Sequence, residues 1–132
     1  MVKKFFVCPS CGNIVALVND SGVPVICCGE PMKELVPKST DTGSEKHVPV
    51  VKCEGDKVSV KIGSTSHPME SDHFIEWVYL QTTCGCQMKC LKPKDKSEVC
   101  FSICSGEKVV KVMAYCNLHG LWQIQPKCEK SK

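Results

Sequence analysis

The chain has 132 residues, a length that suits one ordinary domain or one modest domain with a small module attached. Its formal net charge is only +3, and its 17 basic residues are spread along the chain, so it has no basic block typical of nucleic-acid-binding proteins. Its first apolar run, Phe5-Phe6-Val7, is too short for a signal peptide, and no later run has the length of a membrane span. We therefore expect a cytoplasmic protein.

The first expected domain covers residues 1–37. Two short runs within it, 13–18 and 23–26, are rich in β-branched residues and predict strands, with a turn between them. Residues 37–45 then have the Pro, Ser, Thr and Gly content of a linker. We expect a second domain over residues 38–132.

Cysteine is the unusual component of the composition, with 12 residues in 132. In a secreted protein this density would indicate a disulfide-rich scaffold. In the reducing cytoplasm, clustered cysteines are more often metal ligands than disulfides. The positions of the cysteines therefore bear directly on function.

The first domain contains two cysteine pairs that can bring four thiolates to one ion. Cys8 and Cys11 have the Cys-x-x-Cys-Gly spacing that aims both sulfur atoms at one metal. Cys27 and Cys28 are adjacent instead, and because neighbouring side chains diverge, we expect coordination by both to distort a tetrahedral site. Iron and zinc both accept four sulfur ligands, so the spacing leaves the metal undecided.

The second domain reads as a series of short strands separated by turn sequences, with no convincing amphipathic helix. One run alternates cleanly, so Val58, Val60 and Ile62 are predicted to share a face. This pattern predicts an all-β fold, an antiparallel sandwich of seven strands. The seven predicted strands cover residues 47–51, 57–62, 74–80, 88–91, 99–103, 108–115 and 121–124.

All four histidines of the chain also lie in the second domain: His47, His67, His73 and His119. Cys116 precedes His119 by three residues, a pair that could be half of a zinc site, a nucleophile with its base, or ligands of a redox metal. Any single histidine is more often a surface or core residue than a ligand. Four histidines at strand ends and loops, together with one cysteine, could surround one ion.

These segments resemble a known family. Residues 45–51 (EKHVPVV), 63–77 (GSTSHPMESDHFIEW) and 115–122 (YCNLHGLW) resemble the iron site of superoxide reductases. The CPSCG and CCGEPMK segments resemble the desulforedoxin module that precedes that site in desulfoferrodoxins. The resemblance covers nearly the whole chain, roughly residues 5–125.

The resemblance implies both a fold and an activity. The fold would be a small desulforedoxin-like module followed by a seven-stranded immunoglobulin-like sandwich, usually in a homodimer. The activity would be the one-electron reduction of superoxide to hydrogen peroxide, with electrons from a rubredoxin-like donor. Glu45 and Lys46 match the family's mobile glutamate and its lysine.

The resemblance also implies two iron ions per chain. The first would be held by Cys8, Cys11, Cys27 and Cys28, a site where zinc can replace iron. The catalytic iron would be held by four equatorial histidine nitrogens and one axial thiolate, from His47, His67, His73, His119 and Cys116.

The sequence leaves two other functions open. One is an iron electron carrier whose second site is inactive, and the other is a zinc-binding, thiol-rich structural protein. Seven cysteines fall outside both predicted sites, and their spacing does not decide between idle thiols, disulfides and a third metal site. They are Cys53, Cys84, Cys86, Cys90, Cys100, Cys104 and Cys128.

Overall fold

The computed structural model describes residues 2, 4–41, 46–64 and 67–128. These residues form β-strands, turns and irregular segments and contain no helix, which confirms the predicted all-β class. None of them therefore forms a helix long and apolar enough to cross a membrane. The chain divides into two compact units, Met1–Val36 and Pro37–Lys132.

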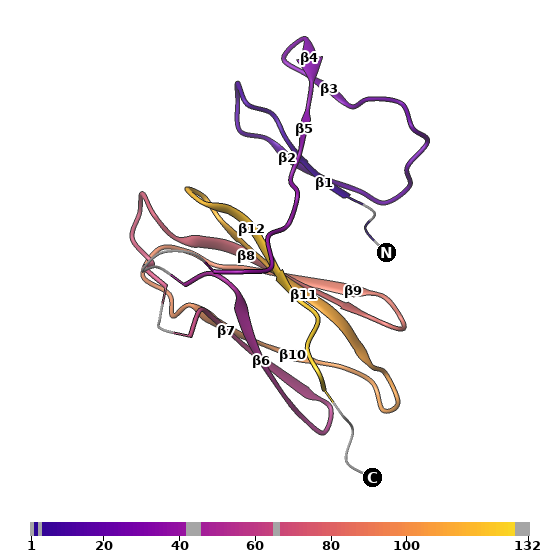
Figure 1. The fold of residues 1–132 in the computed structure, drawn as a ribbon, viewed down its shortest axis with the longest axis vertical. Helices are drawn as coiled ribbons and strands as arrows, with labels where there is room; N and C mark the ends of the chain where they lie inside the picture. The colour runs from indigo at the N-terminus through magenta and orange to yellow at the C-terminus, as the bar shows by residue number, and fades with distance from the viewer. Residues whose placement is uncertain (1, 3, 42–45, 65–66, 129–132) are drawn as a thin grey trace. The chain divides into compact units, whose positions relative to one another are not determined.

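The first unit contains two small antiparallel sheets (Figure 1). Strands β1 (Lys4–Val7), β2 (Ile14–Leu17) and β5 (Lys33–Glu34) form one sheet in the order β2-β1-β5. Strands β3 (Ile26–Cys27) and β4 (Glu30–Pro31) form a separate hairpin.

The sequence predicted only part of this arrangement. Strand β2 lies within the predicted run 13–18, whereas β1 was not predicted. Of the predicted run 23–26, only Ile26 belongs to a strand. Pro24 has no backbone N–H to donate to a ladder, which explains why this strand is so short.

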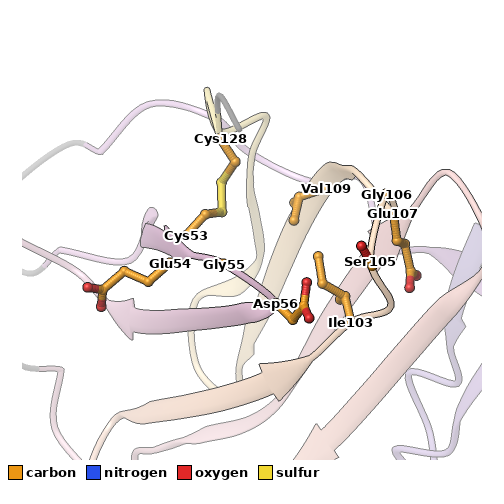
Figure 2. Close-up of a pocket in the computed structure, with 10 residues that line it drawn as sticks. All are labelled: Cys53, Glu54, Gly55, Asp56, Ile103, Ser105, Gly106, Glu107, Val109 and Cys128. Carbon is orange, nitrogen blue, oxygen red and sulfur yellow. A yellow bond between two sulfur atoms is a disulfide. The ribbon is translucent and has the colours of Figure 1, made fainter. Parts of the chain in front are cut away.

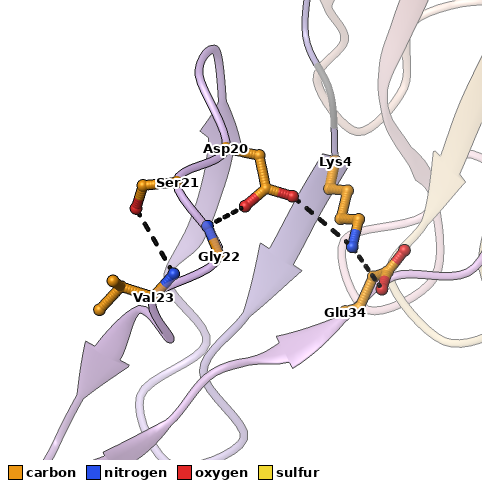
Figure 3. Close-up of polar contacts among 6 residues, drawn as sticks. All are labelled: Lys4, Asp20, Ser21, Gly22, Val23 and Glu34. Carbon is orange, nitrogen blue, oxygen red and sulfur yellow. Dashed lines mark hydrogen bonds and ion pairs between the residues drawn. The ribbon is translucent and has the colours of Figure 1, made fainter.

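Polar contacts of Lys4 connect three segments of the first unit (Figure 3). Its ammonium lies 3.8 Å from a carboxylate oxygen of Asp20 and 3.7 Å from one of Glu34. The other oxygen of Asp20 accepts a hydrogen bond of 2.9 Å from the Gly22 N–H. Exposed ion pairs contribute little stability, so this network mainly fixes the turn before β3 against β1 and β5.

The second unit contains seven strands in two sheets (Figure 1). Each of the seven predicted strands corresponds to one of them, and the predicted seven-stranded immunoglobulin-like sandwich is confirmed. One sheet has the order β10-β7-β6 and the other the order β12-β11-β8-β9, with antiparallel neighbours throughout. The strands are β6 (Pro49–Glu54), β7 (Lys57–Ile62), β8 (Ile75–Thr82), β9 (Cys86–Cys90), β10 (Glu98–Ser102), β11 (Val109–Cys116) and β12 (Gly120–Ile124).

The core of the second unit is made by the inward faces of both sheets. Val58, Val60 and Ile62 of β7 are buried together, as their alternation predicted. They belong to one apolar cluster with Val78 and Leu80 of β8 and with residues of β10 and β11. Burial of each such side chain contributes about 1.5–3 kcal/mol to folding. This packing holds the strands in place, and with them the residues at the ends of the strands.

A disulfide joins Cys53 of β6 to Cys128 in the segment after β12, with a Cα–Cα distance of 5.6 Å. It borders a cavity of about 520 Å³ that is also lined by the β6–β7 turn and the β10–β11 turn (Figure 2). The other five cysteines outside the two predicted sites are free thiols. Of the alternatives that the sequence left open for Cys53 and Cys128, the structure shows a disulfide.

Candidate metal centres

The first candidate centre begins at a tight turn directly after β1. The N–H of Gly12 donates to the carbonyl of Cys8 at 2.9 Å, and the N–H of Cys11 points at the Cys8 sulfur at 3.5 Å. Gly12 has a φ of 81°, a value that glycine adopts at no steric cost. The turn therefore directs both cysteine side chains and a backbone N–H toward one point.

The second arm of this centre is the turn between β3 and β4. Cys28 has a φ of 54° and Gly29 a φ of 78°, so two consecutive residues lie in the left-handed region. This reversal explains how the adjacent Cys27 and Cys28 can face one point despite the divergence expected of neighbouring side chains. The sulfur atoms of Cys8, Cys11, Cys27 and Cys28 all lie within 4.8 Å of one another.

Asn13 also contacts this centre, although no sequence pattern singled it out. Its Nδ2 donates to the Cys27 sulfur at 3.7 Å. Hydrogen bonds to sulfur stabilise a thiolate and tune a bound metal.

The thiols of the first centre differ in acidity. The N–H of Cys11 is the main reason that the pKa of Cys8 falls to about 6. Hydrogen bonding with the Cys8 sulfur raises the pKa of Cys28 to about 12, and contact with the Cys11 sulfur raises the pKa of Cys27. One thiol therefore ionises readily while others keep their protons, so a cation is needed to hold four thiolates together.

The second candidate centre is a closed ring of four imidazoles from four different places in the second unit. His47 precedes β6, His67 lies between β7 and β8, His73 lies just before β8, and His119 lies in the β11–β12 turn. Centroids of successive rings are 4.7, 5.0, 5.2 and 4.9 Å apart. Successive ring planes are inclined by 60° to 84°, so each ring presents its edge to the next.

Cys116 is the last residue of β11 and is fully buried. Its ligand atom and those of His47, His67 and His73 lie within 4.8 Å of one another. His119 is the exposed member, with its Nδ1 3.8 Å from the Cys116 sulfur and 3.2 Å from Nε2 of His47. The structure thus brings together the five residues expected around the catalytic metal.

The orientation of His67 is fixed by its neighbour. Its Nδ1 lies 2.7 Å from the carbonyl oxygen of Pro68. A carbonyl only accepts hydrogen bonds, so Nδ1 carries the proton and a neutral ring presents its lone pair at Nε2. That Nε2 is shielded from solvent, as is Nε2 of His73, which suits nitrogen ligands of a metal.

Two residues that the sequence did not identify support the ring from one side. The Trp122 ring stacks on His47 with a centroid distance of 4.6 Å and an angle of 11°, and its Nε1–H donates to the His119 carbonyl at 3.2 Å. Lys38 lies 5.0 Å from the centre of the Trp122 ring and donates to the same carbonyl at 3.1 Å. These contacts fix His47 and His119 relative to each other.

Asp41 holds the segment that carries His47. Its carboxylate accepts hydrogen bonds from the N–H groups of His47 and Val48 at 2.6 and 3.1 Å. Lys46, the predicted charged residue, is partly buried beside His47. Glu45, the predicted mobile carboxylate, lies outside the described residues.

Comparison with known protein families shows matches over both units of this chain. The family model described as desulfoferrodoxin matches residues 39–125, and the model of the desulfoferrodoxin N-terminal domain matches residues 2–35. The chain belongs to the desulfoferrodoxin family. The family resemblance inferred from the sequence is therefore confirmed.

Similar proteins extend over almost the whole chain. A desulfoferrodoxin homolog of Archaeoglobus fulgidus is 47% identical over 92% of this chain and 96% of its own length. A desulfoferrodoxin of Syntrophotalea carbinolica is 44% identical over 90% of this chain and 93% of its own. The crystal structure of the superoxide reductase from Treponema pallidum matches with a TM-score of 0.81 and 33% identity, covering 92% of this chain and 97% of that one.

Proposed function

We propose that this protein is a superoxide reductase, which reduces superoxide to hydrogen peroxide by one electron. The observation that carries the proposal is the closed ring of four imidazoles with a buried thiol beside it. The similarity to the Treponema pallidum superoxide reductase over nearly the full length of both chains supports it.

The donor set of the ring fits a redox-active iron ion. Imidazole nitrogen suits iron, and one thiolate adds a soft, electron-donating ligand. His47, His67, His73 and His119 would supply the nitrogens and Cys116 the sulfur. Iron bound here would supply the electron for the reaction, a role that zinc cannot fill because it has no redox chemistry.

The two charged residues that precede His47 in the sequence would act on the substrate and its protons. The Lys46 ammonium would attract the superoxide anion and order a water molecule that delivers a proton. Glu45, two residues before His47 in the sequence, would offer a hard carboxylate to the metal once the product has left. The burial of the Cys116 sulfur would protect the thiolate from water and from oxidation.

The four-cysteine centre would hold a second iron ion that carries electrons, with zinc as an alternative occupant. Thiolates at two opposed turns are a common arrangement for either metal. We further propose a first domain over residues 1–37 and a second over 38–132, a rubredoxin-like electron donor, a homodimer and a cytoplasmic location.

The stoichiometry of peroxide formation tests the activity. Reduction consumes one superoxide, one electron and two protons for each hydrogen peroxide, whereas dismutation forms one hydrogen peroxide and one O₂ from two superoxides. We expect the reduced, iron-loaded protein to form one peroxide per superoxide in a single turnover, without evolving O₂. The zinc-loaded protein is the control.

Other results would assign the chain to a different class. Half the peroxide with O₂ release would indicate a dismutase. An iron-loaded ring that superoxide does not oxidise would favour the electron carrier, and a colourless protein with zinc in both centres would favour the structural alternative.

A further inference from the structure

One side chain, that of Asn117, joins two of the loops that carry members of the imidazole ring. Asn117 directly follows Cys116 and lies two residues before His119. Its Oδ1 accepts a hydrogen bond from the Phe74 N–H at 2.9 Å, and its Nδ2 donates to the Asp72 carbonyl at 3.0 Å. A third hydrogen bond, from the Asn117 N–H to the Phe74 carbonyl, measures 3.2 Å.

The partners of this amide lie on either side of His73. Asp72 and Phe74 are the chain neighbours of that residue, so Asn117 fixes the peptide units before and after it. On its other side the loop is closed by reciprocal hydrogen bonds between the backbones of Glu70 and His73, at 2.9 and 3.1 Å. These are local contacts, and they do not tie the loop to the turn that carries Cys116 and His119.

The amide matches both of its partners chemically. Asparagine offers one acceptor oxygen and a donor NH₂ on a short stem, and the two neighbouring peptides offer one N–H and one carbonyl. An aspartate would keep the acceptor and lose the donor, and an alanine would lose both. The two side-chain hydrogen bonds of Asn117 therefore depend on the amide, whereas the backbone bond to Phe74 would remain in any variant.

We propose that Asn117 is a positioning residue, which sets the place of His73 relative to Cys116 and His119 and so determines how tightly and in what geometry the ring binds metal. The proposal rests on the ligand set proposed above. Residues that orient ligands typically change metal affinity by about 10- to 100-fold when they are removed.

The test compares variants of the full-length chain under anaerobic conditions. Metal-free protein is titrated with Fe²⁺ against a competing chelator. Occupancy of the ring is read from its visible sulfur-to-iron band after oxidation of each sample, separately from the bands of the four-cysteine centre. Asn117→Ala should bind iron about 10- to 100-fold more weakly than the unchanged chain. Its band should also shift, because His73 loses the two side-chain hydrogen bonds that hold the peptide units on either side of it.

Two further variants separate positioning from folding. Asn117→Asp keeps the contact with the Phe74 N–H and should show a smaller loss of affinity than Asn117→Ala. Gln87→Ala is the matched control, because Gln87 Nε2 donates to the Ser102 carbonyl at 2.8 Å and thereby also joins two distant segments through an amide. It should leave the affinity and the band unchanged. The melting temperature of each metal-free variant measures any structural effect.

The possible results are distinct. The proposal is supported if Asn117→Ala binds iron more weakly and has a shifted band, and if both changes exceed those in Gln87→Ala. Unchanged affinity and band overturn it, as does a lower metal-free melting temperature with a normal iron centre. If the unchanged chain itself gave no sulfur-to-iron band, the ligand set would be wrong and the role of Asn117 would be rejected with it.

Discussion

Cys116 shows how much of the proposed chemistry depends on a single side chain. Among the described residues it is the cysteine that lies with the four imidazoles, and it is fully buried at the end of β11. Serine has nearly the same shape but is a far weaker electron donor. The exchange therefore tests the sulfur with little disturbance of the packing.

We expect Cys116→Ser to bind ferrous iron still, because the four imidazoles remain. The visible sulfur-to-iron band of the oxidised centre should disappear, and the reduction potential should rise because ferric iron loses an anionic donor. Absorption spectra and a potentiometric titration measure both effects. Cys104→Ser, at an exposed free thiol, is the control. A variant at position 116 that kept the band would exclude the thiolate assignment.

Lys46 gives a second prediction for a single residue. If its charge attracts superoxide, Lys46→Ala should lower the second-order rate by about 3- to 10-fold, and added salt should lower the rate of the unchanged chain. Pulse radiolysis at several ionic strengths measures this rate. The exposed Lys57, the first residue of β7, supplies a control of equal charge. Equal, salt-independent rates in all three proteins would argue against steering by Lys46.

The residues that could be anticipated from sequence are those with distinctive chemistry. The chain has only four histidines, and the spacing of its clustered cysteines, together with the family resemblance, indicated two groups of residues that the structure also brings together. The contacts of Asp41, Asn117 and Trp122 could not be anticipated. A side chain that binds the backbone of a distant segment leaves no periodic signal in the sequence.

At the level of elements, alternation and turn sequences predicted all seven strands of the sandwich. The first unit was harder to predict, because its strands are only two to four residues long and show no full period. The left-handed backbone at Cys28 was also not predictable, because only glycine and asparagine commonly signal that conformation. It is this torsion angle that allows adjacent cysteines to face one point.

The two cysteine turns give a prediction about pH. The pKa of Cys28 is raised to about 12 and that of Cys27 is also raised, so metal binding near pH 7 must release at least two protons. Cys8, with a pKa of about 6, contributes a further proton only below that pH. Affinity should therefore fall as pH falls, and fall more steeply below about pH 6. Titration with Co²⁺, followed by its tetrathiolate absorption, measures this, and a pH-independent affinity would contradict it.

For the molecule as a whole, the two centres draw their side chains from separate units. The four-cysteine centre lies in Met1–Val36 and the imidazole ring in Pro37–Lys132, with no shared residue. Cys28→Ser should therefore disturb the first centre and leave single-turnover oxidation by superoxide within about twofold of the unchanged chain. Stopped-flow spectroscopy measures this rate. A lost rate with a fully loaded ring would show that the centres are coupled.

The disulfide between Cys53 and Cys128 spans a sequence separation of 75 residues. A cross-link over that length is worth about 4.5 kcal/mol in the loop-entropy model. Metal-free protein should therefore unfold at a lower denaturant concentration after reduction, and Cys53→Ser should match the reduced form. An unchanged midpoint would mean that the disulfide adds no net stability.

The same cross-link changes the response of the chain to proteolysis. Three of the four ring histidines and Cys116 lie between residues 53 and 128, and so do the exposed turns after β8 and β10. A single cut in either turn would leave both pieces covalently joined, with the ring's side chains still on one molecule. The two fragments would separate only after the disulfide is reduced. A cut chain with the disulfide would therefore keep its metal ligands on one molecule, whereas a cut chain without it would consist of two separate molecules.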